Sequence, residues 1–163
     1  MNTIFVNGCF DLLTVAHFNL FVFASRLRDL PLSCDKLARS KLFVALDSDE
    51  KIRRDKGSSR PIFTFEERKQ AILALDIGPI EDVFCFDTNE QLHNLIKQVK
   101  PDFIVKSDQW VGNVVGSDIA KVAIFNTLEN FSTSKIIDRV LTKHVYYKEF
   151  MLDEIVKSAR YQK

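Results

Sequence analysis

Short apolar runs alternate with longer segments of mixed polarity along the whole chain. Nearly continuous apolar runs of this length are typical of parallel strands that are buried on both faces of a sheet. The alternation of such strands with helical segments predicts a Rossmann-like, doubly wound α/β fold, in which a parallel five-stranded sheet carries helices on both faces. The predicted strands are Thr3–Val6, Lys41–Leu46, Ile80–Phe86, Asp102–Lys106 and Lys121–Phe125.

Helical patterns fill the segments between these strands. One predicted helix is apolar almost all round, which indicates contact with the sheet and with something else, such as a second subunit. Two others begin at capping-box spacings, Thr64 with Glu67 and Asp87 with Glu90. No linker interrupts the pattern, so residues 1–163 are predicted to form a single domain, with the last helix packed on it. The predicted helices are His17–Arg28, Arg68–Leu75, Gln91–Val99, one starting at Ser132 or Thr133, and one over about 146–161.

Composition narrows the class of protein. A chain of 163 residues with 46% hydrophobic residues suits one self-sufficient core. The net charge of +1 argues against a general nucleic-acid binder. The three cysteines show no metal-ligand spacing, which favours a reduced, cytoplasmic protein without a structural zinc site. We also expect no leader peptide and no membrane-spanning segment.

The stretch NGCFDLLTVAH, Asn7 to His17, joins the first predicted strand to the first helix. Gly8 permits a close backbone approach, and His17 lies where the first amide groups of a helix favour an anion. Asp11 could orient a neighbouring donor or cap the turn. On these residues alone, a phosphate site and an ordinary turn with a solvent-facing histidine are both open.

A basic segment follows the second predicted strand. Within ten residues it carries five positive side chains, interrupted by Gly57, Ser58 and Ser59. We predict a loop that closes over a polyphosphate, because its place at the carboxyl edge of a parallel sheet favours this role over a solvated surface loop. The five basic residues are Lys51, Arg53, Arg54, Lys56 and Arg60.

Two further segments fall on the same predicted edge. Ser132 and Thr133 precede an apolar-periodic helix, where hydroxyl groups either cap the helix or help it to hold a phosphate. Lys106, Asp108 and Trp110 follow the fourth predicted strand and could line a substrate pocket, although the tryptophan could equally fill the core.

Together these segments resemble the cytidylyltransferase-like nucleotidyltransferases, a family marked by a His-x-Gly-His turn. NGCFDLLTVAH resembles the family's first motif, NGxFDxxHxGH, and DSDEKIRRDKGSSRPI followed by FEERKQAIL resembles its basic loop and the next helix. PDFIVKSDQW and FSTSKII are similar to two later motifs. The resemblance is closest to the heptose 1-phosphate adenylyltransferase branch, with the glycerol-3-phosphate cytidylyltransferases next.

The resemblance implies a reaction and its participants. A phosphate oxygen of a sugar or polyol phosphate attacks the α-phosphorus of ATP or CTP, and pyrophosphate leaves, so positioning and charge neutralisation matter more than a protein nucleophile. Mg²⁺ is expected to bridge the phosphates. The apolar first helix and the habit of the family together favour a homodimer. The net charge and the lack of a long apolar run favour neither a nucleic-acid nor a membrane partner, and no metal ligand from the protein is expected.

By position, the resemblance assigns three groups of residues. His17, Thr14, Arg60 and Lys56 would serve catalysis. Gly8, Cys9, Phe10, Asp11, Ser132 and Thr133 would bind the nucleotide or its phosphates. Arg54, Lys106, Asp108 and Trp110 would bind the acceptor. Arg68 occupies a position at which the family has an arginine with a structural or phosphate-facing role.

Two residues depart from the family's first motif. Thr14 stands where the family has a histidine, and Ala16 stands where it has a glycine. Threonine carries no positive charge, and losing one charge-assisted hydrogen bond costs about 2–4 kcal/mol, on the order of 10²–10³ in rate, unless a nearby Lys or Arg compensates. Ala16 adds a methyl group that could crowd a nucleotide. The sequence therefore leaves two functions open: an active nucleotidyltransferase, or a catalytically impaired nucleotide-binding or regulatory protein.

Overall fold

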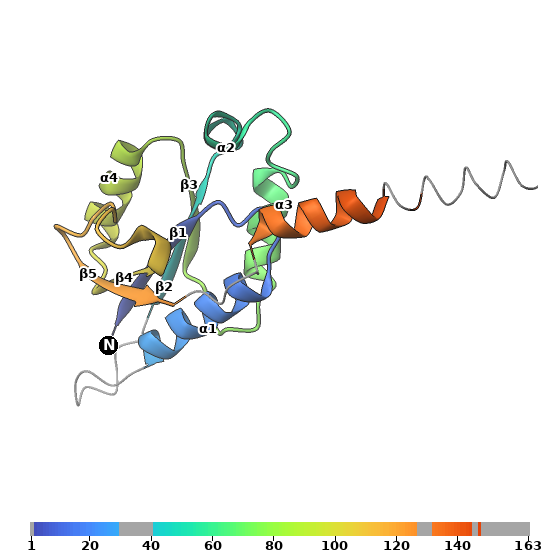
Figure 1. The fold of residues 1–163 in the computed structure, drawn as a ribbon. Coiled ribbons are helices and arrows are strands. Elements are labelled where there is room, and N and C mark those ends of the chain that lie inside the picture. Colours follow the sequence, from blue (N-terminus) through green and yellow to red (C-terminus); the bar gives the residue numbers. More distant parts are fainter. Residues whose placement is uncertain (1, 30–40, 127–131, 145–146, 148–163) are drawn as a thin grey trace, which may run out of the picture. The chain divides into compact units, whose positions relative to one another are not determined.

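The computed structural model describes residues 2–29, 41–126, 132–144 and 147 (Figure 1). The chain divides into two compact units, Met1–Leu128 and Glu129–Lys163. Apart from Tyr147, the predicted helix over 146–161 lies outside the described residues. The prediction of a single domain stays a prediction.

The first unit is built on the parallel sheet that the apolar runs predict. The strands lie in the order β3-β2-β1-β4-β5, and every neighbouring pair is parallel. The order reverses between β1 and β4, and ligands of such sheets bind at this point, beyond the carboxyl ends of the strands. The strands are β1 Thr3–Gly8, β2 Lys41–Asp47, β3 Asp82–Phe86, β4 Phe103–Ser107 and β5 Lys121–Phe125.

Helices cover both faces of this sheet (Figure 1). The helices of the first unit are α1 Val15–Asp29, α2 Asp49–Lys56, α3 Phe65–Leu73 and α4 Asn89–Val99, with a short 3₁₀ helix, η1, at Asp108–Trp110. Alternate residues of β1 point to opposite faces: Ile4 joins the core under α1, whereas Phe5 joins the core under α4. The predicted two-sided α/β sheet is therefore confirmed.

The basic segment is not the loop that its composition predicts. Lys51 to Lys56 are helical, because Ser48 caps α2 by accepting a hydrogen bond from the Lys51 backbone N–H. Acidic residues occupy the first turn of α2 and basic residues its last turn, which suits the helix dipole. The helix ends at Gly57, whose φ of 93° suits glycine. The loop between α2 and α3 runs over residues 57–64, and of the five basic residues it holds only Arg60.

Of the two predicted capping boxes, one is present in the structure and one is not. The capping box of Thr64 and Glu67 is confirmed at the start of α3. The prediction that Asp87 caps α4 is wrong: Thr88 caps it by accepting from the Gln91 N–H, while the Asp87 carboxylate accepts from Ser48. Asp87 and Thr88 are both good N-cap residues, and the spacing to Glu90 alone does not show which of them caps the helix.

In the second unit, residues 133–144 form a helix. The Ser132 hydroxyl accepts a hydrogen bond from the Lys135 backbone N–H at 3.3 Å, so the predicted helix start and its cap are confirmed. None of the described helices is long and apolar enough to cross a membrane.

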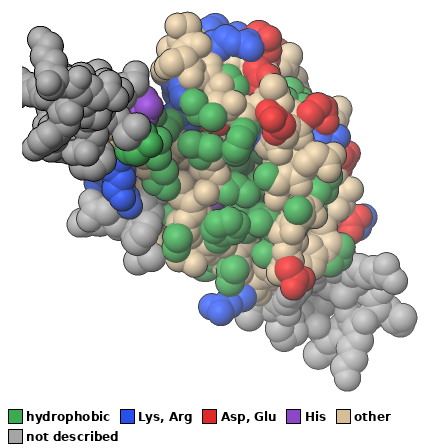
Figure 2. Space-filling model, turned by 90° about the vertical axis from the view of Figure 1, so that its right-hand side faces the viewer, with side chains coloured by type: hydrophobic (Ala, Val, Ile, Leu, Met, Phe, Trp, Pro, Cys, Tyr) green, Lys and Arg blue, Asp and Glu red, His purple; other side chains and the backbone are tan. Residues whose placement is uncertain are grey.

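Part of α1 is exposed and apolar. Val15, Phe18 and Val22 recur at helical spacing and are 49%, 43% and 39% exposed. Hydrophobic side chains gather on the side of the molecule that faces right in Figure 1 (Figure 2). The exposed stripe agrees with the prediction that α1 contacts the sheet on one side and something else on the other.

Candidate active site

The turn after β1 places an aromatic support beneath the start of α1. Phe10 and Leu12 have positive φ values of 48° and 62°. A side chain on Gly8 would place its Cβ 3.1 Å from the Phe10 ring, so glycine lets the turn fold back on the strand. The Phe10 ring packs against Phe21 and against the edge of His17, with ring centroids 4.9 and 5.3 Å apart.

His17 is held as a neutral hydrogen-bond donor. Its Nδ1 accepts a hydrogen bond from the Thr14 backbone N–H at 3.1 Å, which puts the imidazole proton on Nε2. Burial and the positive charge of Lys56 lower the pKa of His17 to about 4, against an opposing backbone contact with Leu12. The imidazole is therefore uncharged at neutral pH.

Thr14 acts on His17. The threonine is only 3% exposed, and its hydroxyl oxygen lies 3.2 Å from His17 Nδ1. Its carbonyl accepts the Phe18 N–H at 3.0 Å at the start of α1. Thr14 thus contacts the imidazole through both its backbone N–H and its hydroxyl, and its predicted catalytic role stays a prediction. Ala16 is buried as well.

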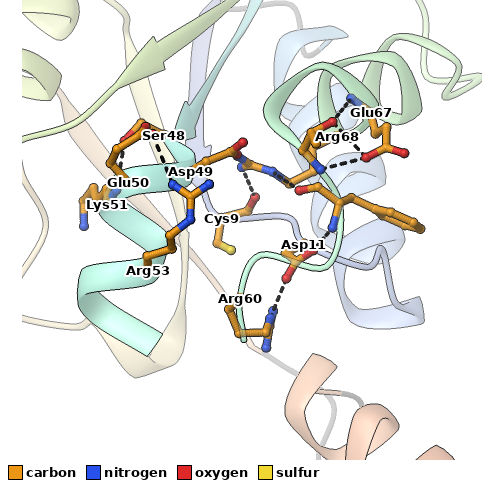
Figure 3. A network of polar contacts seen from close by, with 12 residues as sticks. Cys9, Asp11, Ser48, Asp49, Glu50, Lys51, Arg53, Arg60, Glu67 and Arg68 are labelled. Carbon is orange, nitrogen blue, oxygen red and sulfur yellow. Dashed lines mark hydrogen bonds and ion pairs between the residues drawn. The ribbon is translucent and has the colours of Figure 1, made fainter. Parts of the chain in front are cut away.

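Asp11 ties the turn to the segment that carries Arg60. Its buried carboxylate accepts hydrogen bonds from the backbone N–H groups of Ile62 and Phe63 and from Arg60 Nε (Figure 3). Burial alone would raise the pKa of Asp11, but the backbone N–H groups and the guanidinium hold it below its usual value. Of the two roles open to Asp11, the structure shows the one that orients a donor.

Arg60 has an N–H donor, beside its bond to Asp11, that makes no hydrogen bond within the described residues. Its side chain is 9% exposed, and its Nε is bound to Asp11. Its buried Nη2 has no hydrogen-bond partner among the described residues. A buried guanidinium N–H without an acceptor is costly, and an anionic ligand would satisfy it. Arg60 is therefore a fixed cation that is suited to a phosphate oxygen.

The resemblance left a structural and a phosphate-facing role open for Arg68, and its contacts are those of a structural residue. The fully buried guanidinium donates to the carbonyl oxygens of Cys9 and Phe63 and forms an ion pair with Asp49, with Nη2 and Oδ1 2.7 Å apart (Figure 3). It thereby joins the turn after β1, the segment before α3 and the first turn of α2.

The basic residues of α2 separate into two groups. Lys56 interacts electrostatically with His17 and with Cys9, which places its charge at the turn. Arg54 instead donates to the Asp87 carbonyl at 2.8 Å and pairs with the Asp87 carboxylate. The structure therefore brings Lys56 to the turn, whereas Arg54, predicted to bind the acceptor, is bound to the residue that follows β3.

Lys106 lies at the carboxyl end of β4. Lys106 is buried, and its ammonium group donates to the Asn7 carbonyl at 3.1 Å and lies 4.5 Å from the centre of the Trp110 ring. Burial lowers the pKa of Lys106 to about 8, and Lys51 adds to this shift while Asp47 opposes it. Asp108 is exposed and accepts the Gln109 N–H in η1.

Asp47 is a site residue that the sequence interpretation missed. It closes β2, and Lys51, Lys106 and Lys56 all interact with its carboxylate. Burial raises its pKa, and the three lysines oppose that rise. Its signal in the sequence is an acidic residue directly after the predicted strand Lys41–Leu46.

Ser132 and Thr133 belong to the second unit. Ser132 caps its helix there, and the proposed contacts of both hydroxyls with nucleotide phosphates stay predictions. The candidate site in the first unit consists of the β1–α1 turn, Arg60, Lys56 and the Lys106–Asp47 group.

The lowered pKa of His17 predicts an acid-sensitive fold. A folded-state pKa of about 4, against 6.5 for an ordinary histidine, means that the unfolded chain binds more protons between those values. The free energy of unfolding contributed by His17 is therefore complete above pH 6.5 and declines as the pH falls towards 4. Urea unfolding at a series of pH values should show a smaller loss for His17→Gln than for the natural chain. Equal losses in the two proteins would contradict a buried, neutral His17.

At the switch point of this parallel α/β sheet lie a glycine-containing turn, a histidine at the start of a helix and a buried arginine. This arrangement is typical of nucleotide-binding sites. The sequence profile of the cytidylyltransferase-like family matches residues 5–150, and the chain belongs to that family. The bifunctional protein HldE of Campylobacter concisus is 38% identical over 139 residues, which are 84% of this chain and 26% of that protein. HldE of Syntrophotalea carbinolica is 36% identical over 147 residues, 86% of this chain and 27% of its own length. The chain thus spans about a quarter of the length of these relatives.

Solved structures support the fold. The lipopolysaccharide core biosynthesis protein from Thermoplasma volcanium aligns with a TM-score of 0.59 at 18% identity, covering 79% of this chain and 99% of its own. A macrolide-efflux protein from Streptococcus pneumoniae aligns with a TM-score of 0.53 at 16% identity, over 83% of this chain and 51% of its own. At these identities the likeness concerns the fold alone.

Proposed function

We propose that this chain is a nucleotidyltransferase that joins ATP or CTP to a sugar or polyol phosphate, with heptose 1-phosphate as the first acceptor to test. The observation that carries the proposal is Arg60, which Asp11 of the β1–α1 turn orients and whose buried Nη2 has no partner among the described residues. The neutral donor His17 lies at the start of the helix that follows the same turn. The family and the HldE relatives support the same reaction class.

The reaction follows from what these groups can bind. The acceptor's phosphate oxygen attacks the α-phosphorus, the bond to the bridging oxygen breaks, and pyrophosphate leaves with the electron pair. His17, Arg60 and Lys56 would donate to oxygens on which negative charge develops. The nucleoside triphosphate would arrive as its magnesium complex, and the ion would supply positive charge to its phosphates.

We further propose that the chain works as a homodimer. The exposed apolar stripe of Val15, Phe18 and Val22 on α1 supports this, since such a surface is stabilised by burial against another subunit. Sedimentation of the purified chain measures the state directly.

One assay tests the proposed reaction. The purified chain is incubated with magnesium, each of the four nucleoside triphosphates and a panel of sugar and polyol phosphates, and pyrophosphate release is measured. Turnover with one pair is the expected result. The second candidate, a nucleotide-binding protein with impaired chemistry, is favoured by Thr14 in place of a histidine. Triphosphate binding by calorimetry without turnover for any pair would establish it.

Thr14→His separates these candidates further. The hydroxyl of Thr14 is turned towards His17, so a histidine would add a donor that the natural site lacks. We expect the variant to raise kcat by up to about 10²-fold, the effect of one transition-state donor. Thr14→Val, which keeps the backbone bond to His17, is the matched control and should leave kcat within about threefold. A Thr14→His variant that is no faster than the natural chain would show that the missing histidine does not limit the reaction.

A further inference from the structure

Asp87 contacts both ends of α2 and has no part in the mechanism above. It directly follows β3, and its carboxylate accepts a hydrogen bond from the hydroxyl of Ser48, the N-cap of α2. Arg54, in the last turn of α2, donates to the Asp87 carbonyl at 2.8 Å, and its Nη2 lies 3.1 Å from the Asp87 carboxylate. The Ser48 N–H also donates to the Phe86 carbonyl at 2.8 Å. The end of β3 therefore binds α2 at both ends of the helix.

These attachments matter because α2 has few other contacts that could fix its position. The helix has 8 residues, and a helix of this length is unstable in water without tertiary contacts. Within α2, Ile52 is the one buried side chain. A single apolar contact lets a short helix pivot, whereas polar contacts at both ends fix its direction. The contacts of Asp87 are therefore placed to set the orientation of α2.

The Asp87 side chain is not needed to start the next helix. Thr88 caps α4, and the Asp87 backbone N–H donates to the Gln91 side chain at 2.6 Å. The hydrogen bonds from Ser48 and Arg54 lower the pKa of the Asp87 carboxyl, so it is ionised at neutral pH. Hydrogen bonds to an ionised acceptor are stronger than those between neutral groups. The Asp87 carboxylate is thus directed at α2 rather than at α4.

The first turn of α2 is bound to the turn that follows β1. Asp49 of α2 pairs with the buried Arg68 at 2.7 Å, and Arg68 donates to the Cys9 carbonyl at 2.8 Å (Figure 3). Cys9 belongs to the β1–α1 turn, which leads to His17. A shift of α2 would move the acceptor that faces Arg68, and so would disturb the support of this turn.

The other end of α2 leads into the segment that carries Arg60. The Gly57 N–H donates to the Arg53 carbonyl at 3.0 Å, and the Arg60 N–H donates to the Gly57 carbonyl at 3.1 Å. The backbone of Arg60 is therefore tied to the end of the helix, while Asp11 holds its guanidinium. We propose that Asp87 is a positioning residue, which fixes α2 and thereby holds Arg60 and the β1–α1 turn in the arrangement that suits a phosphate. This inference rests on the proposed function for the role of Arg60.

Two measurements on the full chain test the role of Asp87. In native-state hydrogen exchange, Asp87→Ala should speed the exchange of the Lys51 and Arg60 amides by about tenfold or more, while the amides of β1 and β4 stay within about twofold. In calorimetry with inorganic pyrophosphate, the same variant should bind about fivefold more weakly, because Arg60 is less well placed. Loss of a negative charge would by itself favour an anion, so weaker binding would not be a charge effect. Asp55→Ala is the matched control, since Asp55 also pairs with a basic residue but within α2, and it should change each quantity by less than about twofold.

Faster exchange in β1 and β4 as well as in α2 would overturn the assignment, because Asp87 would then support the fold in general. Unchanged exchange in α2, an unchanged affinity for pyrophosphate, or a natural chain that does not bind pyrophosphate would overturn it as well. Should Asp87→Ala fail to fold, Asp87→Asn keeps an acceptor for Ser48 but loses the charge opposite Arg54, and it should change both quantities by about threefold. A natural chain that binds pyrophosphate but releases none with any triphosphate and acceptor disproves the proposed function, and the comparison of affinities still decides the role of Asp87.

Discussion

Replacing His17 by alanine should lower kcat/KM for pyrophosphate release by about 10²–10³, the cost of removing one preorganised donor. The structure gives the loss two sources. The Nε2 donor disappears, and the Thr14 backbone N–H loses the Nδ1 acceptor that it has at 3.1 Å. Because burial keeps the imidazole neutral at working pH, the lost interaction is a hydrogen bond rather than a full positive charge.

His17→Gln distinguishes a neutral donor from a charged one. Glutamine at the third position of a helix can accept from the capping residue's N–H through its carbonyl and still present an amide donor. We expect His17→Gln to be at least about tenfold more active than His17→Ala. His93→Ala is the matched control, since His93 lies in α4 and pairs with Asp118, and it should leave turnover unchanged. If glutamine proves no better than alanine, the neutral-donor role of His17 is wrong.

The fold could be predicted from the sequence because the sheet is buried on both faces. In β2, Leu42, Val44 and Leu46 pack into the core on one face, and Phe43 and Ala45 pack on the other, so the strand is a nearly continuous apolar run and a strong local signal. The strand boundaries move by at most two residues, as for β3, which starts at Asp82 where Ile80 was predicted. A local signal of this kind needs no knowledge of the rest of the chain.

The contacts of the site could not be predicted in the same way. Asp11 and Arg60 are 49 residues apart, and no spacing shows that a carboxylate orients that guanidinium. The helical form of Lys51 to Lys56 depends on the cap at Ser48, whereas charge composition alone indicates a loop. The importance of Asp47 depends on Lys106, which comes from a strand on the other side of β1. Sequence identifies the chemistry-bearing residues, and tertiary contacts decide which of them act together.

The tertiary contacts of Arg68 are expected to contribute strongly to the stability of the site. Its guanidinium is fully buried and joins three segments through the Cys9 carbonyl, the Phe63 carbonyl and the Asp49 carboxylate. Arg68→Met keeps much of the buried aliphatic volume but leaves all three acceptors without their donor. We expect the free energy of unfolding to fall by about 3–5 kcal/mol, as for removal of one partner of a buried ion pair.

Urea denaturation of Arg68→Met measures this loss, and Arg53→Met is its matched control. Arg53 pairs with Glu50 on the surface of α2, with both side chains about half-exposed or more, so its removal should cost less than about 1 kcal/mol. Arg68→Lys should fall between the two, because an ammonium keeps the charge near Asp49 but cannot reach three acceptors in the plane of a guanidinium. A similar small loss for Arg68→Met and Arg53→Met would show that the turn holds His17 and Asp11 in place without the arginine.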